Sequence, residues 1–190
     1  MPGPILYSDF NCPYCYATHE RLERLGLHDR VRWRGVQHSP ELPRPMRAAA
    51  GPFAAELARE VESIRLRAPE VPIELPTGKP NTGPAIELAA AAGGEAAGGL
   101  VLGLYRRFWR DGEDLSDPDV LAAALAASDG DGAATGRDGA ALAREWQREW
   151  SRLGVGGVPL LVAADGRHLY GLVDAEELAR FIAADPEPRA

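Results

Sequence analysis

The chain has 190 residues, of which 45% are hydrophobic and 26% charged, and its formal net charge at pH 7 is −7. This length allows one domain or two small ones, and it is sufficient to bury a hydrophobic core. The acidic balance argues against nucleic acid or an anionic membrane as the main partner. No apolar run approaches the roughly 18 to 20 residues of a membrane-spanning helix, and no signal-peptide pattern precedes the first predicted strand. We therefore expect a cytoplasmic protein.

The first 37 residues have the pattern of a strand, a helix and a second strand. The apolar run at residues 5–7 predicts a buried strand, and residues 13–25 predict a helix that ends at Gly26. Residues 30–37 alternate between apolar and polar side chains, which indicates a second strand. This order with short connections predicts two parallel strands joined by a right-handed crossover.

From residue 46 to residue 153 the hydrophobic periodicity is helical. Ser116 or Asp117 is expected to cap a helix that begins at Pro118, and the Gly- and Asp-rich residues 128–139 predict a loop. We expect Trp109, Trp146 and Trp150 to lie in a core or at a domain interface. The apolar stripes are Leu57, Val61, Ile64 and Ala68; residues 85–92; Leu100, Leu104 and Phe108; Val120, Leu121 and Leu125; and Leu142, Trp146, Trp150 and Leu153.

A sheet pattern returns after Gly154. Residues 159–163 predict a buried strand, residues 165–166 a hairpin turn and residues 167–172 its partner strand, and Asp174 is expected to cap a final helix. Neither outer unit can bury a sheet alone, so the two must meet in one mixed four-stranded sheet with helices on its faces. The sequence thus predicts an α/β protein in which residues 1–45 and 154–190 form one domain and residues 46–153 form an inserted helical domain.

The only two cysteines, Cys12 and Cys15, stand three apart between the first predicted strand and the first predicted helix. A helix N-terminus presents unpaired N–H groups and a partial positive charge, which lower the pKa of a cysteine there. Pro13 suits the first helical position. Cys12 is therefore the expected N-cap residue and nucleophile, and Cys15 the expected inward-facing resolving thiol. Two unrelated buried thiols or half of a zinc site with His19 and His38 are the alternatives, but a second Cys-x-x-Cys is absent, so we expect no metal.

Four segments carry a resemblance to known proteins: residues 9–16 (DFNCPYCY), 80–82 (PNT), 104–112 (LYRRFWRDG) and 154–159 (GVGGVP). The chain resembles the DsbA family, whose members have a thioredoxin fold with a helical domain inserted in the middle. The match is closest to the FrnE-like branch, which is related to 2-hydroxychromene-2-carboxylate isomerase and kappa-class glutathione transferase. Those two relatives have serine in place of Cys12, so disulfide exchange is the better interpretation here.

The resemblance implies further site residues. It places a cis proline at Pro159, facing the cysteine pair, so that the backbone of Val158 can pair with a client peptide. It also implies that Pro13, Tyr14 and Asn81 contact substrate, with Tyr14 as a flat aromatic surface beside the disulfide. Without the resemblance, Val158–Pro159 reads as an ordinary trans proline at a strand edge, and Asn81 as a residue that bonds the local backbone of a Pro-rich loop.

Three functions remain possible. The first is a thiol–disulfide oxidoreductase that acts on protein or small-thiol clients through Cys12 and Cys15. The second is a glutathione-dependent isomerase or transferase, and the third is a redox-sensing module that binds clients without catalysis. We expect no cofactor, although glutathione could be a co-substrate, and the oligomeric state stays open.

Other polar residues near these segments have simpler interpretations. Asp9 is expected to anchor the loop before the helix, with proton transfer to Cys15 as an alternative role. His19 is expected to decorate the helix without a specific role. The arginines at positions 106, 107 and 110 are expected on a solvated face, with contact to an acidic client or to the carboxylates of glutathione as the alternative.

Overall fold

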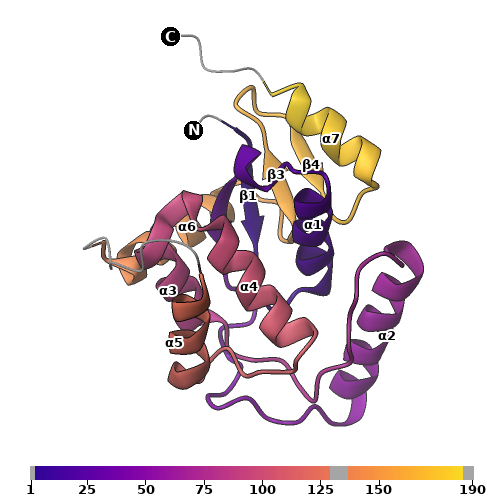
Figure 1. Cartoon of the computed structure of the whole chain (residues 1–190), viewed down its shortest axis with the longest axis vertical. Coiled ribbons are helices and arrows are strands. Elements are labelled where there is room, and N and C mark those ends of the chain that lie inside the picture. Colours follow the sequence, from indigo (N-terminus) through magenta and orange to yellow (C-terminus); the bar gives the residue numbers. More distant parts are fainter. Residues whose placement is uncertain (1–2, 129–136, 186–190) are drawn as a thin grey trace.

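A computed structural model describes residues 3–128 and 137–185 (Figure 1). Its centre is a four-stranded sheet of order β2-β1-β3-β4. The strands are β1 (Ile5–Ser8), β2 (Arg32–Gly35), β3 (Leu160–Val162) and β4 (His168–Tyr170). The first pair, β1 and β2, is parallel, whereas β3 is antiparallel to both β1 and β4. The predicted mixed four-stranded α/β sheet is therefore confirmed, with β2, β3 and β4 each slightly shorter than the predicted strand.

Seven α-helices and two short 3₁₀ turns surround this sheet in the described part of the chain. Five of the α-helices follow β2 and precede β3, where the sequence predicts the helical insertion. The predicted loop at residues 128–139 is shorter at its C-terminal end, because α6 already begins at Gly139, and residues 129–136 lie outside the described residues. The helices are α1 (Pro13–Arg24), η1 (His28–Arg30), α2 (Gly51–Arg67), α3 (Gly83–Gly93), η2 (Gly94–Ala96), α4 (Gly98–Trp109), α5 (Pro118–Ala127), α6 (Gly139–Arg152) and α7 (Ala175–Ala183).

Aspartates cap three of these helices. Asp117 accepts a hydrogen bond from the backbone N–H of Asp119 at 2.8 Å, which makes Asp117 rather than Ser116 the N-cap of α5. Asp174 accepts from the N–H of Glu177 at 2.7 Å at the start of α7, as predicted. Asp138 caps α6 in the same way. Each carboxylate satisfies an N–H group that the helix itself leaves unpaired.

The two faces of the sheet are covered by different helices. On one face, Leu6 and Leu161 pack against Leu22 of α1 and Leu178 of α7. On the other face lie Tyr7 and Leu160, and the adjoining apolar side chains come from the end of α6 and the segment that follows it. Figure 1 shows α1 and α7 to the right of β1 and α6 to its left. Alternation along β1 and β3 thus buries both faces, because successive strand residues point in opposite directions.

A larger hydrophobic cluster joins the N-terminal unit to the inserted helices. It runs from Tyr16 of α1 and Trp33 of β2 to Ile64 of α2, Phe108 of α4 and Trp146 of α6. Of the three tryptophans expected in a core or interface, two are buried in this cluster and Trp150 is half-buried against the sheet. The insertion therefore packs against α1 and β2 through a continuous apolar interior.

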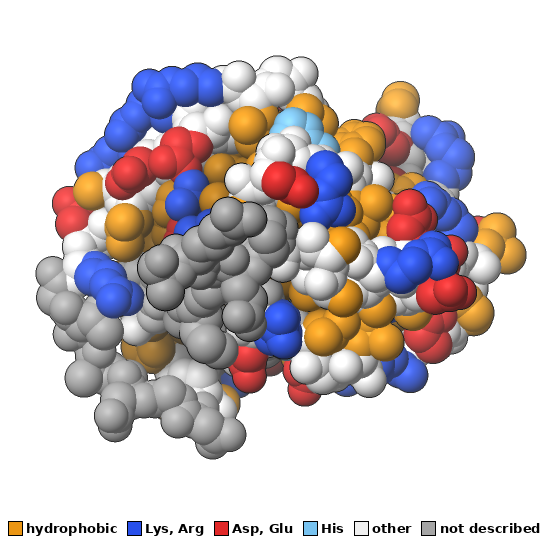
Figure 2. Space-filling view, turned by 90° about the horizontal axis from the view of Figure 1, so that it is seen from above, with side chains coloured by type: hydrophobic (Ala, Val, Ile, Leu, Met, Phe, Trp, Pro, Cys, Tyr) orange, Lys and Arg blue, Asp and Glu red, His pale blue; other side chains and the backbone are white. Residues whose placement is uncertain are grey.

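The surface carries charges of both signs. On the face in Figure 2, acidic and basic side chains intermingle around small apolar patches, without a continuous basic field among the described residues shown there. Across residues 3–128 and 137–185, no helix combines the length and apolar character that crossing a bilayer requires.

Candidate active site

The two cysteines lie where the loop after β1 enters α1. Cys12 is the N-cap residue, with extended backbone angles (φ −99°, ψ 114°), and Pro13 is the first helical residue. Cys15 therefore sits in the first turn. Both cysteines are free thiols in this structure. Cys12 is 7% exposed and Cys15 is fully buried, so the outer and inner positions match the expected order of nucleophile and resolving thiol.

The two thiols have opposite pKa shifts. A hydrogen bond from the Cys15 thiol lowers the pKa of Cys12 most, against the effect of burial, and the backbone N–H of Cys15 and the charge of His38 lower it further. Burial raises the pKa of Cys15 well above its usual value, and its hydrogen bond to Cys12 raises it further. A thiolate at Cys12 beside a protonated Cys15 is the arrangement that nucleophilic attack by the outer sulfur requires.

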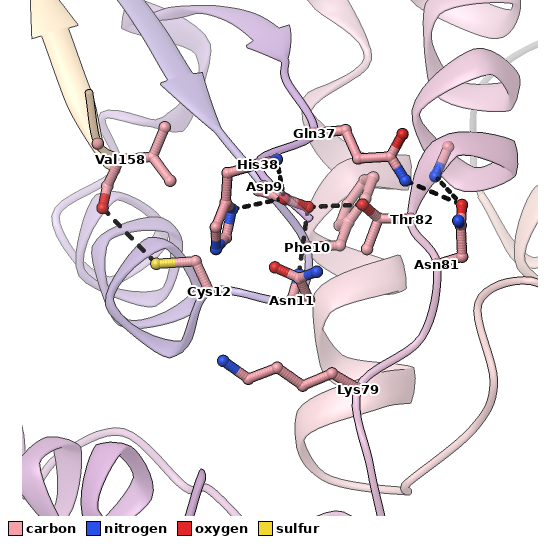
Figure 3. Close-up of polar contacts among 12 residues, drawn as sticks. Asp9, Phe10, Asn11, Cys12, Gln37, His38, Lys79, Asn81, Thr82 and Val158 are labelled. Atoms are coloured by element: carbon pink, nitrogen blue, oxygen red, sulfur yellow. Dashed lines mark hydrogen bonds and ion pairs between the residues drawn. The ribbon is translucent and has the colours of Figure 1, made fainter. Parts of the chain in front are cut away.

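Val158 faces Cys12 from the other side of the site. The Cys12 thiol donates a hydrogen bond to the carbonyl oxygen of Val158, with 3.6 Å between the heavy atoms (Figure 3). The Val158–Pro159 peptide bond is cis, and Pro159 is buried directly before β3. Residues 146 positions apart in the chain thus meet at the reactive sulfur.

Tyr14 and Val158 also border an open cavity of about 320 Å³. Arg67 of α2 lies over the Tyr14 ring, with its guanidinium carbon 5.7 Å from the ring centroid. The same guanidinium donates a hydrogen bond to the Leu172 carbonyl. Tyr170, which is 58% exposed, also lines this cavity. An aromatic face, a guanidinium and a peptide carbonyl therefore surround a space next to Cys12.

Pro13, which was also predicted to contact substrate, is buried and offers no exposed surface for a client.

Asp9 is a fully buried carboxylate at the centre of a hydrogen-bond cluster. One oxygen accepts from the Thr82 hydroxyl at 2.6 Å and from the Asn11 N–H at 3.4 Å. The other accepts from the backbone N–H of His38 at 2.9 Å and pairs with the Nδ1 atom of His38 at 2.7 Å (Figure 3). Asp9 thus joins the β1 loop, the segment after β2 and the start of α3, which fits its predicted role as an anchor of the loop.

His38 is the member of this cluster that reaches solvent. Burial lowers its pKa, but the hydrogen bond and charge of Asp9 and the charge of Cys12 outweigh burial and raise the pKa above its ordinary value; Lys79 acts in the opposite direction. The imidazole is 35% exposed. His38 therefore presents a readily protonated ring beside Cys12.

Helix α4 fixes the loop that leads to Cys12. The Tyr105 hydroxyl donates to the carbonyl of Asp9 at 3.0 Å, and the indole N–H of Trp109 donates to the carbonyl of Phe10 at 2.9 Å. Both aromatic side chains are fully buried. Buried carbonyls without a partner are costly, so these bonds hold the loop in one position.

Asn81 lies near the site without facing the cysteines. Its amide oxygen accepts from Gln37, Arg44 and the N–H of Gly83, and its amide nitrogen donates to the carbonyls of Pro40 and Leu42. The side chain is only 5% exposed. It therefore supports the Pro-rich loop, and its neighbour Thr82 makes the contact to Asp9.

The interpretation of His19 as a decoration of the helix surface is wrong. His19 is fully buried, because α4 packs against α1 and places the Tyr105 ring 4.7 Å from the imidazole. Its ring nitrogens lie 3.1 Å from the Ser8 hydroxyl and 3.0 Å from Nε2 of His28, so it does not face the cysteines. Within the described residues, no group of three or more His, Cys, Asp and Glu side chains is arranged to hold a metal ion.

The buried pair of His19 and His28 predicts an acid-sensitive fold. Burial lowers the pKa of both imidazoles, that of His19 well below 6.5, so protonation favours the unfolded chain. The stability they contribute is present above the unfolded pKa and is lost as pH falls below about 6.5. Between pH 7 and pH 5 we expect His19 alone to cost about 2 kcal/mol in the free energy of unfolding, measured by urea titration.

Matched variants isolate this effect. His19→Gln should flatten the pH dependence between pH 7 and pH 5, whereas His168→Gln, at an exposed position on β4, should leave it unchanged. A pH dependence that is identical in wild type and His19→Gln would contradict the assignment. His38 acts in the opposite direction, because its raised pKa adds stability at low pH that is lost as pH rises through its folded value.

The arginine cluster is paired within the protein. Arg106 and Arg110 of α4 both contact the carboxylate of Glu20, at 2.8 and 2.5 Å, and Glu20 is 2% exposed. Arg107 pairs with Glu113 at 2.7 Å. These arginines are partly exposed, as a solvated face implies, but each is paired with a carboxylate of the protein itself.

Comparisons with known proteins agree with this architecture. Residues 5–183 match the family of DSBA-like thioredoxin domains, and the chain belongs to that family. The predicted thioredoxin fold is thereby confirmed, and the FrnE-like branch is consistent with the neighbours found. No curated protein matches the chain at the level of sequence.

Three solved structures illustrate the likeness. A probable DsbA oxidoreductase from Streptomyces coelicolor has a TM-score of 0.73 and 18% identity, over 98% of this chain and 92% of that one. A 2-hydroxychromene-2-carboxylate isomerase has a TM-score of 0.67 and 16% identity, over 95% and 93%. The cytosolic disulfide reductase DsbM from Pseudomonas aeruginosa, with glutathione, has a TM-score of 0.62 and 16% identity, over 96% and 93%. At these identities the likeness shows the shared fold.

Proposed function

We propose that the chain is a cytoplasmic thiol–disulfide oxidoreductase that exchanges disulfides with protein or small-thiol clients through Cys12 and Cys15. The observation that carries this proposal is the contrast between the two thiols. Cys12 is slightly exposed with a lowered pKa, and Cys15 is buried with a raised pKa. The cytosolic DsbM neighbour, described with glutathione, supports the compartment and a small thiol as one possible client.

The exchange has two balanced steps. The Cys12 thiolate attacks one sulfur of a client disulfide, which forms a Cys12–client disulfide and releases the other client sulfur as a thiolate. Cys15 then loses its proton and attacks Cys12, which forms the Cys12–Cys15 disulfide and releases the second client thiolate. Run in reverse, the same steps oxidise a client dithiol, so the direction depends on the reduction potential.

Client binding would use the backbone of Val158 and the ring of Tyr14. The Val158 carbonyl already accepts a hydrogen bond from Cys12 and borders the cavity with Tyr14. An extended client could pair with this backbone as an added strand does. We assign Pro159, Pro13 and Asn81 to the support of this arrangement, because their side chains are buried.

The test is turnover with a defined disulfide. Catalytic reduction of insulin by dithiothreitol would support the proposal, as would the loss of two protein thiols per disulfide reduced in a single turnover without dithiothreitol. Glutathione-dependent isomerisation of an aromatic substrate without thiol consumption would favour the isomerase alternative, and client binding without turnover would favour a redox sensor. Equilibration in glutathione buffers then gives the direction: a potential near about −120 mV indicates an oxidant, and one near about −270 mV a reductant.

A further inference from the structure

His38 is held in one orientation by Asp9. The Oδ2 atom of Asp9 lies 2.7 Å from Nδ1 of His38. The same oxygen accepts a hydrogen bond from the backbone N–H of His38 at 2.9 Å. Because Nδ1 is occupied, the nitrogen left to exchange a proton is Nε2, which has no hydrogen-bond partner among the described residues. A carboxylate in this position fixes the tautomer of an imidazole and stabilises its protonated form.

The free side of the imidazole faces the region of Cys12. Figure 3 shows the His38 ring between the Asp9 carboxylate and the space next to Cys12 and Asn11. The ring is 35% exposed, so a small group from solvent or from a client can reach it. The Asn11 side-chain amide is fully buried and has no hydrogen-bond partner in the described part of the chain.

The charged groups around His38 come from several elements. Asp9 precedes α1, Cys12 caps α1, and Lys79 extends toward the same region from the segment before α3 (Figure 3). The Lys79 ammonium is paired at 2.6 Å with Glu60 of α2, which offsets its repulsion of a protonated imidazole. Cys12 and His38 each shift the pKa of the other toward its charged form.

We propose that His38, oriented by Asp9, is the acid–base partner of Cys12. It takes the proton of the Cys12 thiol, which gives a thiolate and an imidazolium. When the thiolate attacks a client disulfide, the imidazolium returns this proton to the departing client sulfur, so that a thiol leaves and His38 becomes neutral again. The proton passes from Cys12 to the departing thiol, and no other reactant is needed. This inference rests on the proposed function, which it extends to proton transfer.

The first test measures the thiolate directly and needs no client. The rate of Cys12 alkylation by iodoacetamide is followed against pH in a Cys15→Ser background, alone and with His38→Gln or His168→Gln. We expect His38→Gln to raise the apparent pKa of Cys12 by about 0.5 to 1 pH unit, since it removes an adjacent cation. The His168→Gln control should not shift it. Equal alkylation rates at high pH show that access to the sulfur is unchanged.

The reciprocal measurement guards against a folding artefact. Linkage requires that removal of the Cys12 thiolate lowers the pKa of His38 as much as removal of His38 raises that of Cys12. NMR titration of the imidazole signals in the Cys15→Ser background, with and without Cys12→Ser, should show this fall, with the His38 signal assigned by its loss in His38→Gln. Two unshifted titrations would overturn the proposal, whether or not the protein catalyses disulfide exchange.

The second test asks whether His38 donates the proton. An aliphatic disulfide such as 2-hydroxyethyl disulfide releases a basic thiolate that benefits from a proton donor, whereas an aromatic disulfide releases a weakly basic one. His38→Gln should slow reduction of the aliphatic disulfide by about tenfold or more and that of the aromatic one much less. If His38→Gln slowed the reduction of both disulfides equally, His38 would act only through its charge on the Cys12 thiolate. That result would overturn the proton-donor role. Failure of both wild-type reactions would instead refute the proposed function.

Discussion

Replacement of Cys12 with serine should lower the rate of disulfide reduction by about three orders of magnitude or more, because the hydroxyl of serine does not ionise near pH 7 and cannot replace the thiolate. Cys12 is the more exposed sulfur and the one with the lowered pKa, whereas Cys15 is fully buried with a raised pKa. Insulin reduction and single-turnover thiol release are the measurements.

The Cys15→Ser variant is the matched control. It keeps the nucleophile, so the first step should continue and a Cys12–client disulfide should accumulate, visible by mass spectrometry. If Cys15→Ser abolished adduct formation while Cys12→Ser accumulated an adduct, the assignment of nucleophile and resolving thiol would be reversed.

A second large effect is expected for Trp109→Ala. The Trp109 side chain is fully buried, stacks near Tyr16 with 6.4 Å between ring centroids, and donates to the Phe10 carbonyl at 2.9 Å. Truncation opens a cavity and leaves that carbonyl unpaired, so the free energy of unfolding should fall by about 4 kcal/mol or more. For a domain of this size the melting temperature should fall by about 8 to 16 °C.

The Trp109→Phe variant separates packing from the hydrogen bond. It keeps a six-membered aromatic ring and removes the indole N–H with the rest of the second ring, so its cost should be about 1 to 2 kcal/mol, well below that of Trp109→Ala. Urea unfolding of both variants at pH 7 provides the comparison. A Trp109→Ala variant within about 1 kcal/mol of wild type would mean that the Phe10 loop does not depend on α4.

Local signals predicted the parts of the site that are close in the sequence. Pro13 sets the first turn of α1, and the spacing of the two cysteines places one sulfur at the N-cap and the other inside the helix. The caps at Asp117 and Asp174 were predictable for the same reason, since each bonds a residue two or three positions away. The parallel pairing of β1 and β2 was predicted from the rule for crossover connections.

Partners that meet only through folding were not predictable. Asp9 contacts His38 and Thr82 across 29 and 73 positions, and no periodicity marks such a pairing. The sequence considered His38 only as a possible zinc ligand, and its place beside Cys12 depends on where β2 ends. His19 was misread because a helical pattern does not reveal that α4 packs against α1 at this position.

The two hydrogen bonds from α4 to the carbonyls of Asp9 and Phe10 constrain how this protein can be re-engineered. They join residues 96 and 99 positions apart, directly before the reactive sulfur. A chimaera that combined these cysteines with a relative's helical region lacking Tyr105 and Trp109 would leave both carbonyls without donors. In such a hybrid the reactivity of Cys12 would change even with every residue from 1 to 45 retained. The cysteine motif and the helical region must therefore be transplanted together.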